Sequence, residues 1–154
     1  DILINNAGVY HGRGQIFGEL NYEDWLKTMQ INLLAPVKIA EVFVENLLIG
    51  EKKCLVNITS QMGSIADNNS GGSYLYRSSK AALNAAVKSV SIDMKEQGLI
   101  AVVLHPGWVK TDMGGENASM SAEESIRRMS QVIDQLNPEK SGKFLNYDGN
   151  EIEW

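Results

Sequence analysis

The sequence predicts an α/β fold built on a parallel sheet, and three observations support this class. Short, largely apolar runs at 2–4, 54–58 and 99–104 are typical of parallel strands buried on both faces. Longer segments with apolar residues every three or four positions alternate with them, as helices would. A late segment, 143–147, alternates as a half-exposed edge strand does. Strands that alternate with helices favour parallel pairing.

The first predicted helix begins at Asn21, an N-cap residue followed three positions later by the acidic Asp24. Its apolar spacing continues to Leu47 and is interrupted once, at Pro36. Proline has no N–H, so the carbonyl four residues earlier, that of Asn32, is expected to lose its helical partner and to become free to bind water.

Two further helices are predicted. One follows the double glycine at 71–72 and is expected to end near Gly98, a residue suited to a helix C-terminus. The other begins at Ser121, where Ser121 and Glu124 form a capping-box pattern, and stops at 137–138, an Asn-Pro pair.

Three polar residues stand out because their chemistry is complementary. Tyr76 and Lys80 are four residues apart on a predicted helix, so they share one face. A nearby cation is expected to lower the pKa of a tyrosine from about 10 towards neutrality, which suits proton transfer near neutral pH. Ser60 ends the second apolar run, and the carboxyl ends of parallel strands are where such folds bind ligands.

Four motifs in this order resemble the short-chain dehydrogenase/reductase family. They are an Asn-Asn-Ala-Gly turn at 5–8, Ser60, the Tyr76–Lys80 pair, and the loop 106–111 after the third apolar run. The segment HPGWVKTDMGG and the ending FLNYDGNEIEW are more narrowly similar to the carbonyl-reductase branch that includes the sniffer and C-factor proteins.

The resemblance implies the C-terminal part of a Rossmann-like, doubly wound parallel sheet with three layers, α/β/α. Members of the family usually open with a Gly-rich strand–turn–helix that binds the cofactor pyrophosphate. Residues 1–154 contain no such turn. We therefore expect one domain over 1–154, an incomplete dinucleotide-binding Rossmann domain that is a fragment of a longer protein or a truncated product.

The resemblance also implies reversible hydride transfer between NADP (or NAD) and a small carbonyl or alcohol substrate. Tyr76 would be the general acid, Ser60 would hold the substrate oxygen, and Lys80 would lower the Tyr76 pKa and bind the ribose. Asn32 would anchor a water relay through its backbone carbonyl. The cofactor contacts implied are Asn5, Asn6, Ala7, Gly8, Tyr76, Lys80, Pro106, Gly107, Val109 and Thr111.

Bulk properties exclude several classes of partner. The net charge is −5 with a pI near 5.0 and no basic block, which argues against nucleic acid and anionic membranes. No apolar stretch is long enough to span a bilayer. The single cysteine, Cys54, rules out an internal disulfide and indicates a reducing cytoplasm. No cluster has metal-ligand spacing, so no metal is expected.

Two alternatives remain at this point. One is a non-catalytic, truncated or signalling module of the same fold, because the family forms a dimer or tetramer through two long helices that the chain retains. The other, a serine hydrolase using Ser60 and His105, is disfavoured. Ser60 lacks a Gly-x-Ser-x-Gly elbow, and a hydrolase gives no reason for Tyr76 and Lys80. His105 is interpreted as structural.

Overall fold

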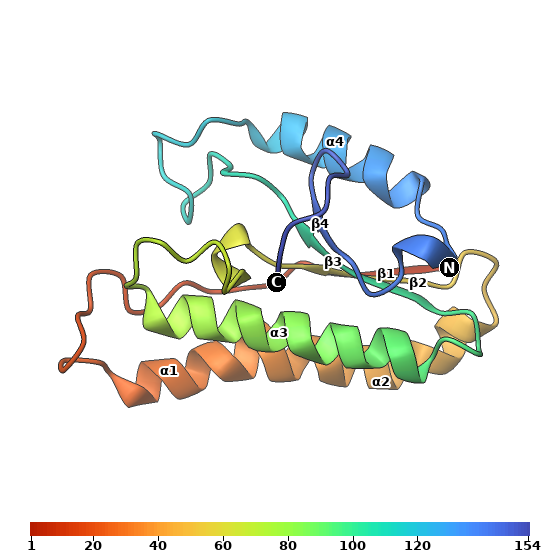
Figure 1. The fold of residues 1–154 in the computed structure, drawn as a ribbon, viewed down its shortest axis with the longest axis horizontal. Coiled ribbons are helices and arrows are strands. Elements are labelled where there is room, and N and C mark those ends of the chain that lie inside the picture. Colours follow the sequence, from red (N-terminus) through yellow and green to blue (C-terminus); the bar gives the residue numbers. More distant parts are fainter.

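A computed structural model describes all residues 1–154 and shows a four-stranded, wholly parallel sheet (Figure 1). Neighbouring strands pair in the order β1-β2-β3-β4, so each crossover between them moves one position along the sheet. The strands are β1 (Ile2–Asn5), β2 (Cys54–Ile58), β3 (Ile100–His105) and β4 (Phe144–Asn146). The α/β class and the parallel pairing predicted from the sequence are confirmed.

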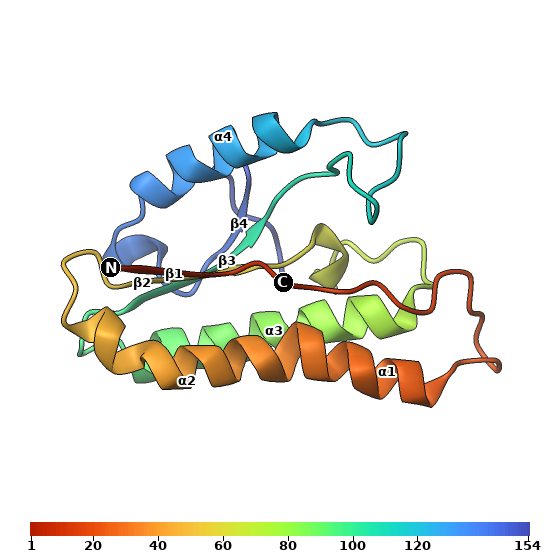
Figure 2. The ribbon, with the colours of Figure 1, turned by 180° about the vertical axis from the view of Figure 1, so that it is seen from behind.

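Helices cover both faces of this sheet, giving the predicted three layers (Figures 1 and 2). One face carries α1 (Tyr22–Met29), α2 (Ala35–Leu48) and α3 (Tyr74–Asp93). The other face carries α4 (Ala122–Asp134). Short 3₁₀ turns, η2 (Gln61–Gly63) and η3 (Pro138–Lys140), lie in the connections. None of the helices combines the length and the apolar composition that crossing a membrane requires.

Alternation along the strands divides the core into two clusters, one for each face of the sheet. The cluster towards α2 and α3 consists of Leu47, Leu55, Leu83, Val87, Leu99, Ala101, Val103 and Phe144. The cluster towards α4 consists of Cys54, Val56, Ile58, Ile100, Val102, Leu104 and Leu145. Because β2 and β3 are buried on both faces, their positions at the centre of the sheet are fixed by both clusters.

The expectation that the first strand is buried on both faces is wrong. Ile2 is 36% exposed and Ile4 is 48% exposed. They pair in register with Cys54 and Val56, so they point to the face that α4 covers. The α4 side chains pack against the cluster on β2, β3 and β4, which leaves β1 uncovered on that face.

Two helix starts are confirmed by their caps. The Asn21 side chain accepts hydrogen bonds from the N–H groups of Glu23 and Asp24. The Ser121 hydroxyl accepts one from the Glu124 N–H, at 3.2 Å. The reciprocal half of the capping box does not form, because the Glu124 carboxylate accepts hydrogen bonds from two arginines of its own helix.

The interruption of the first long helix differs in form from the expected kink. A π-helical segment, η1 (Gln30–Leu34), joins α1 to α2, and Pro36 lies in the first turn of α2. A proline is tolerated in a first turn, where its missing N–H has no helical partner to lose. The wider turn before it is a π-bulge of the kind found at functional sites.

Two element boundaries need correction. Helix α3 ends at Asp93, where the Met94 N–H bonds back to Val90, and Gly98 lies in the turn before β3 with φ +78. The last strand is not half-exposed. Phe144 and Leu145 are each 1% exposed, because β4 contributes one residue to each core cluster. Both faces of this edge strand are therefore buried, although it lies at the edge of the sheet.

Candidate active site

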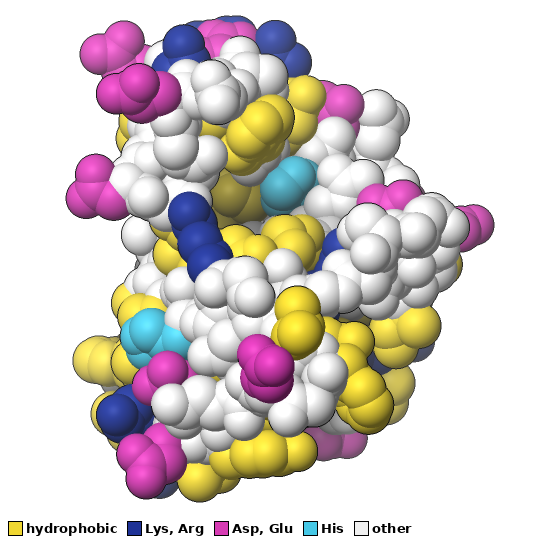
Figure 3. All heavy atoms as spheres, turned by 90° about the vertical axis from the view of Figure 1, so that its left-hand side faces the viewer, with side chains coloured by type: hydrophobic (Ala, Val, Ile, Leu, Met, Phe, Trp, Pro, Cys, Tyr) yellow, Lys and Arg dark blue, Asp and Glu magenta, His cyan; other side chains and the backbone are white.

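The carboxyl ends of β1, β2 and β3 open into a cavity of about 860 Å³. In the space-filling view the opening is a hollow between two halves of the molecule, with hydrophobic side chains on its floor (Figure 3). The predicted site residues that line it are Asn6, Ala7, Gly8, Ser60, Tyr76, Lys80, Pro106, Gly107, Val109 and Thr111. Motifs that are far apart in the sequence thus meet at one end of the sheet, as expected for a parallel α/β fold.

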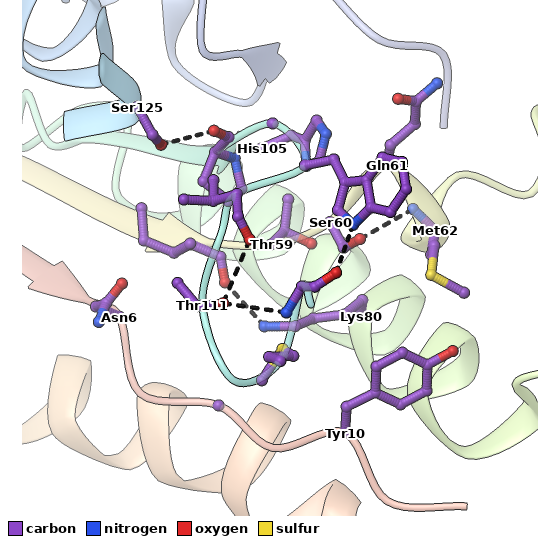
Figure 4. Close-up of a pocket in the computed structure, with 18 of the residues that line it drawn as sticks. Asn6, Tyr10, Thr59, Ser60, Gln61, Met62, Lys80, His105, Thr111 and Ser125 are labelled. Carbon is purple, nitrogen blue, oxygen red and sulfur yellow. Dashed lines mark hydrogen bonds between the residues drawn. The ribbon is translucent and has the colours of Figure 1, made fainter. Parts of the chain in front are cut away.

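Ser60 lies just beyond β2, with an extended backbone, and is 8% exposed. Its hydroxyl accepts a hydrogen bond of 3.1 Å from the Met62 N–H and so caps the short turn η2 (Figure 4). Ser60 and Tyr76 line the same cavity, on one side of the sheet. Burial raises the pKa of the Tyr76 phenol, and the nearby Ser60 hydroxyl acts in the opposite direction.

Tyr76 and Lys80 occupy the first turns of α3 and are 7% and 4% exposed. The Lys80 ammonium lies 5.8 Å from the centroid of the Tyr76 ring and donates a hydrogen bond of 2.9 Å to the Ile58 carbonyl. Burial lowers the pKa of Lys80 to about 8, because the charged form loses hydration. Near neutral pH this lysine is still mainly a cation.

The expected lowering of the Tyr76 pKa by Lys80 is not seen. Burial raises the pKa of Tyr76 above 10, which is the largest effect, and the Ser60 hydroxyl and the Arg13 charge act in the opposite direction. The Lys80 ammonium is directed at the Ile58 carbonyl. Desolvation of the phenolate therefore outweighs the favourable charges in this structure.

Asn32 is 1% exposed and lies behind the cavity wall, in η1. Its side chain accepts a hydrogen bond from the Val9 N–H and donates one to the Val9 carbonyl, each 2.9 Å long. It also donates to the Ser79 hydroxyl of α3. The side chain thus ties the loop after β1 to α3. The water relay through its backbone carbonyl stays a prediction.

Small residues after β1 allow the backbone to approach this centre closely. A Cβ atom added to Gly8 would lie 3.4 Å from Asn32 Oδ1 and 3.5 Å from Lys80 Nζ. Asn5, unlike the three residues that follow it, does not line the cavity. Its amide donates to the Pro36 carbonyl and to Asn57 Oδ1, so it fastens β1 to α2 and β2.

His105 and Ser125 were not among the predicted site residues, yet both line the cavity (Figure 4). His105 ends β3, its Nδ1 is buried without a hydrogen-bond partner, and burial lowers its pKa to about 4. The interpretation of His105 as structural stays a prediction, and the structure adds that this residue borders the cavity. Ser125 donates a hydrogen bond of 2.7 Å to the Pro106 carbonyl and fixes that loop to α4.

No group of three or more His, Cys, Asp or Glu side chains is placed to hold a metal ion. The polar side chains that line the cavity include the Ser60 and Tyr76 hydroxyls and the Lys80 ammonium. Such groups donate and accept hydrogen bonds. The cavity at the strand ends places the protein in the class of parallel α/β folds that bind ligands there.

The chain belongs to the short chain dehydrogenase family, whose model matches residues 1–122. It is 48% identical to the C-signal of Myxococcus xanthus, over all of this chain and 92% of that protein. It is 36% identical to 1-hydroxy-2-glutathionyl-2-methyl-3-butene dehydrogenase of Rhodococcus sp. (strain AD45), over 95% of this chain and 67% of that protein.

Solved structures agree with this assignment. The carbonyl reductase Sniffer of D. melanogaster superposes with a TM-score of 0.93 at 36% identity, over 99% of this chain and 66% of that one. An NADPH-bound carbonyl reductase from chicken fatty liver superposes with a TM-score of 0.89 at 35% identity, over 98% of this chain and 64% of that one. The chain thus spans about two thirds of the length of these reductases.

Proposed function

We propose that the protein is an oxidoreductase that transfers a hydride between NADPH (or NADH) and a small carbonyl or alcohol substrate. The single observation that carries the proposal is the meeting of Ser60, Tyr76 and Lys80 in one cavity at the carboxyl ends of parallel strands. Membership of a dehydrogenase family supports it, and so do the carbonyl reductases of similar structure. When bound, the nicotinamide cofactor supplies or accepts the hydride.

The residues present fit such a cofactor. The backbone after β1 is accessible from the cavity because Asn6, Ala7 and Gly8 are small or exposed. Gly8 lies close to Lys80, since a Cβ atom added to it would be 3.5 Å from Lys80 Nζ. The Lys80 ammonium has donors left beyond its bond to Ile58, so it can bind ribose hydroxyls. The loop at Pro106, Gly107, Val109 and Thr111 would border the nicotinamide. We assign 1–154 to one dinucleotide-binding domain that lacks the Gly-rich turn.

The protein's own groups would manage the proton. Ser60 would donate a hydrogen bond to the substrate oxygen and hold it beside the Tyr76 phenol, which would give its proton as that oxygen becomes an alcohol. The raised pKa of Tyr76 keeps the phenol protonated near neutral pH, as an acid must be. Asn32 would support Lys80 through the loop that contains Val9 and Gly8.

The experiment has two readouts on purified protein. NADPH and NADH are titrated while the tryptophan fluorescence is followed, to which the cavity residue Trp108 contributes. Reduction of a small aldehyde is assayed by loss of NADPH absorbance. We expect saturable binding, turnover in the wild type, and loss of turnover without loss of binding in Tyr76→Phe. Phenylalanine keeps the ring and removes only the proton that is transferred.

The outcomes separate the two readings of the chain. Turnover retained in Tyr76→Phe would remove Tyr76 from the role of acid. Flat fluorescence traces with both cofactors, in protein that melts cooperatively, would favour the non-catalytic module instead. Tyr22→Phe serves as a matched control, because Tyr22 is 70% exposed on α1 and does not line the cavity. We also propose that the protein forms homo-oligomers through its long helices.

A further inference from the structure

The Tyr76 ring does not stand alone in the cavity wall. The Tyr10 ring stacks on it, with ring centroids 4.3 Å apart and planes 19° from parallel. The Arg13 guanidinium lies over the Tyr10 ring, 4.6 Å from its centroid. Three planar groups from two distant parts of the sequence therefore form one column, which we call the Arg13–Tyr10–Tyr76 column.

Two members of the column, Tyr10 and Arg13, are anchored at their polar ends. The Tyr10 hydroxyl shares a hydrogen bond of 2.5 Å with the Ser73 hydroxyl, directly before α3. Arg13 Nη2 donates to the Met113 carbonyl, in the loop on the other side of the cavity. The column thus joins three segments that border the cavity: the loop after β1, the start of α3 and the loop after β3.

Tyr10 lines the cavity, and its ring contacts two other side chains there: Tyr76 stacks on it and the Arg13 guanidinium lies over it. The stacking connects any role of Tyr10 to the orientation of Tyr76. Stacking of aromatic rings and a cation over a ring are both attractive and directional, so together they favour one orientation of the side chains involved.

We propose that Tyr10 and Arg13 are positioning residues for Tyr76: the stacked Tyr10 ring holds the phenol in orientation, and the Arg13 guanidinium places a positive charge near it. This inference rests on the proposed function, since it deepens the role of Tyr76 as the acid. In this proposal Arg13, and not Lys80 as expected from the sequence, supplies the positive charge that lowers the pKa of the Tyr76 phenol.

The charged groups around Tyr76 support this division. Arg13 lowers the pKa of Tyr76 and Tyr10 raises it, while burial remains the largest effect. On its own helix the neighbouring cations are Arg77 and Lys80, and Lys80 points its ammonium at the Ile58 carbonyl. The remaining charged residues that line the cavity are Asp67 and Asp112.

The test of Arg13 is a titration that needs no turnover. The Tyr76 phenolate is followed by its ultraviolet absorbance, as the difference between each protein and the same protein carrying Tyr76→Phe. Arg13 lies over the Tyr10 ring, and Tyr76 lies one stacked ring further. At a separation on the order of 9 Å, a unit charge shifts a pKa by roughly 0.3 unit at the dielectric of water and by roughly 1.4 units at an effective dielectric of about 20. We expect Arg13→Gln to raise the Tyr76 pKa by an amount in this range. Arg13→Lys keeps the positive charge, so the Tyr76 pKa should stay close to that of the wild type.

The test of Tyr10 is kinetic. Tyr10→Leu removes the ring, and we expect it to lower kcat about 10- to 100-fold with little change in the Kd for NADPH, because misplacement of a reacting group costs rate more than binding. Tyr10→Phe keeps the ring and loses only the bond to Ser73, so it should restore most of kcat. For Arg13→Gln, the matched control is Lys95→Gln, which removes the charge of an exposed residue just after the end of α3.

The outcomes are decisive in each direction. An unchanged Tyr76 titration in Arg13→Gln overturns the electrostatic role, and equal losses in Tyr10→Phe and Tyr10→Leu overturn the stacking role. If the wild type reduces no carbonyl but Arg13→Gln still shifts the titration, the proposed function fails while the column stands. If carbonyls are reduced and neither variant has an effect, the column fails alone.

Discussion

The ammonium of Lys80 donates a hydrogen bond of 2.9 Å to the backbone carbonyl of Ile58, the last residue of β2. This bond joins the first turns of α3 to the strand end that presents Ser60. It also holds a charge inside the protein, since Lys80 is 4% exposed and forms no ion pair. Lys80 is therefore held at the site at a cost in stability, which pH should reveal.

Burial lowers the pKa of Lys80 from 10.5 to about 8. Between these values the unfolded chain binds the proton more tightly than the folded one, so the Lys80 contribution to the free energy of unfolding rises with pH. Below pH 8 the penalty of the buried charge is fully present. We expect Lys80→Met to be more stable than the wild type near pH 7, and this advantage to shrink by about 3 kcal/mol as the pH rises from 8 to 10.5.

Urea unfolding of both proteins at several pH values measures this difference directly. Lys95→Met, which changes an exposed lysine, should show a difference from the wild type that does not vary with pH. A Lys80→Met difference that is equally constant would mean that Lys80 is not destabilised by burial.

Gly63 marks the closest approach between η2 and α3. A Cβ atom there would lie 3.0 Å from the backbone carbon of Lys80 and 3.1 Å from Asn84 Nδ2. We expect Gly63→Ala to lower the free energy of unfolding by about 1 to 3 kcal/mol, because the turn and the helix must separate. The same shift moves Ser60 away from Tyr76, so turnover should fall as well.

Gly8→Ala is a matched comparison for stability, since its Cβ atom would meet neighbours only at 3.4 Å or beyond. It should leave the urea midpoint nearly unchanged. Equal midpoints for Gly63→Ala and the wild type would show that the backbone can relax at Gly63 without strain.

Ser125, on α4, holds the loop after β3 through a hydrogen bond. It is 2% exposed, and its hydroxyl is a 2.7 Å donor to the Pro106 carbonyl. In Ser125→Ala that carbonyl loses its partner, which costs about 1 to 3 kcal/mol when the group stays buried. We expect lower stability and weaker NADPH binding, because the loop would border the cofactor. Ser130→Ala, an exposed serine on the same helix, should change neither quantity. Unchanged NADPH binding in Ser125→Ala would show that the hydrogen bond to Pro106 has no role in cofactor binding.

Local patterns in the sequence carried much of the fold and of the site. The caps at Asn21 and Ser121 were predictable because the capping side chain and the amides it serves are at most three residues apart. Ser60 was expected at the site because it follows a strand end, and its meeting with Tyr76 was expected from the resemblance to the family.

What the sequence missed depends on contacts between distant loops. Nothing near Tyr10 indicates that its ring stacks on Tyr76, more than 60 positions away. The burial of Ile2 and Ile4 was overestimated for a related reason: it depends on which strands α4 covers, and strand periodicity does not contain that information. The sign of the Tyr76 pKa shift likewise required the depth of burial.

The continuous helix formed by α1, η1 and α2 carries large apolar side chains that are exposed. Leu26, Leu34 and Val42, one in each element, are 66%, 58% and 61% exposed. Exposed apolar side chains that gather on a surface are typical of an interface, and these support the proposed homo-oligomer. We expect Val42→Glu to convert the oligomer to smaller species in sedimentation or light scattering, because a buried charge would oppose association. Ile65→Glu, at a residue 77% exposed outside the helices, should leave the mass unchanged. A wild type that is monomeric at all concentrations would contradict the proposed homo-oligomer. An oligomer whose mass does not change in Val42→Glu would place the interface elsewhere.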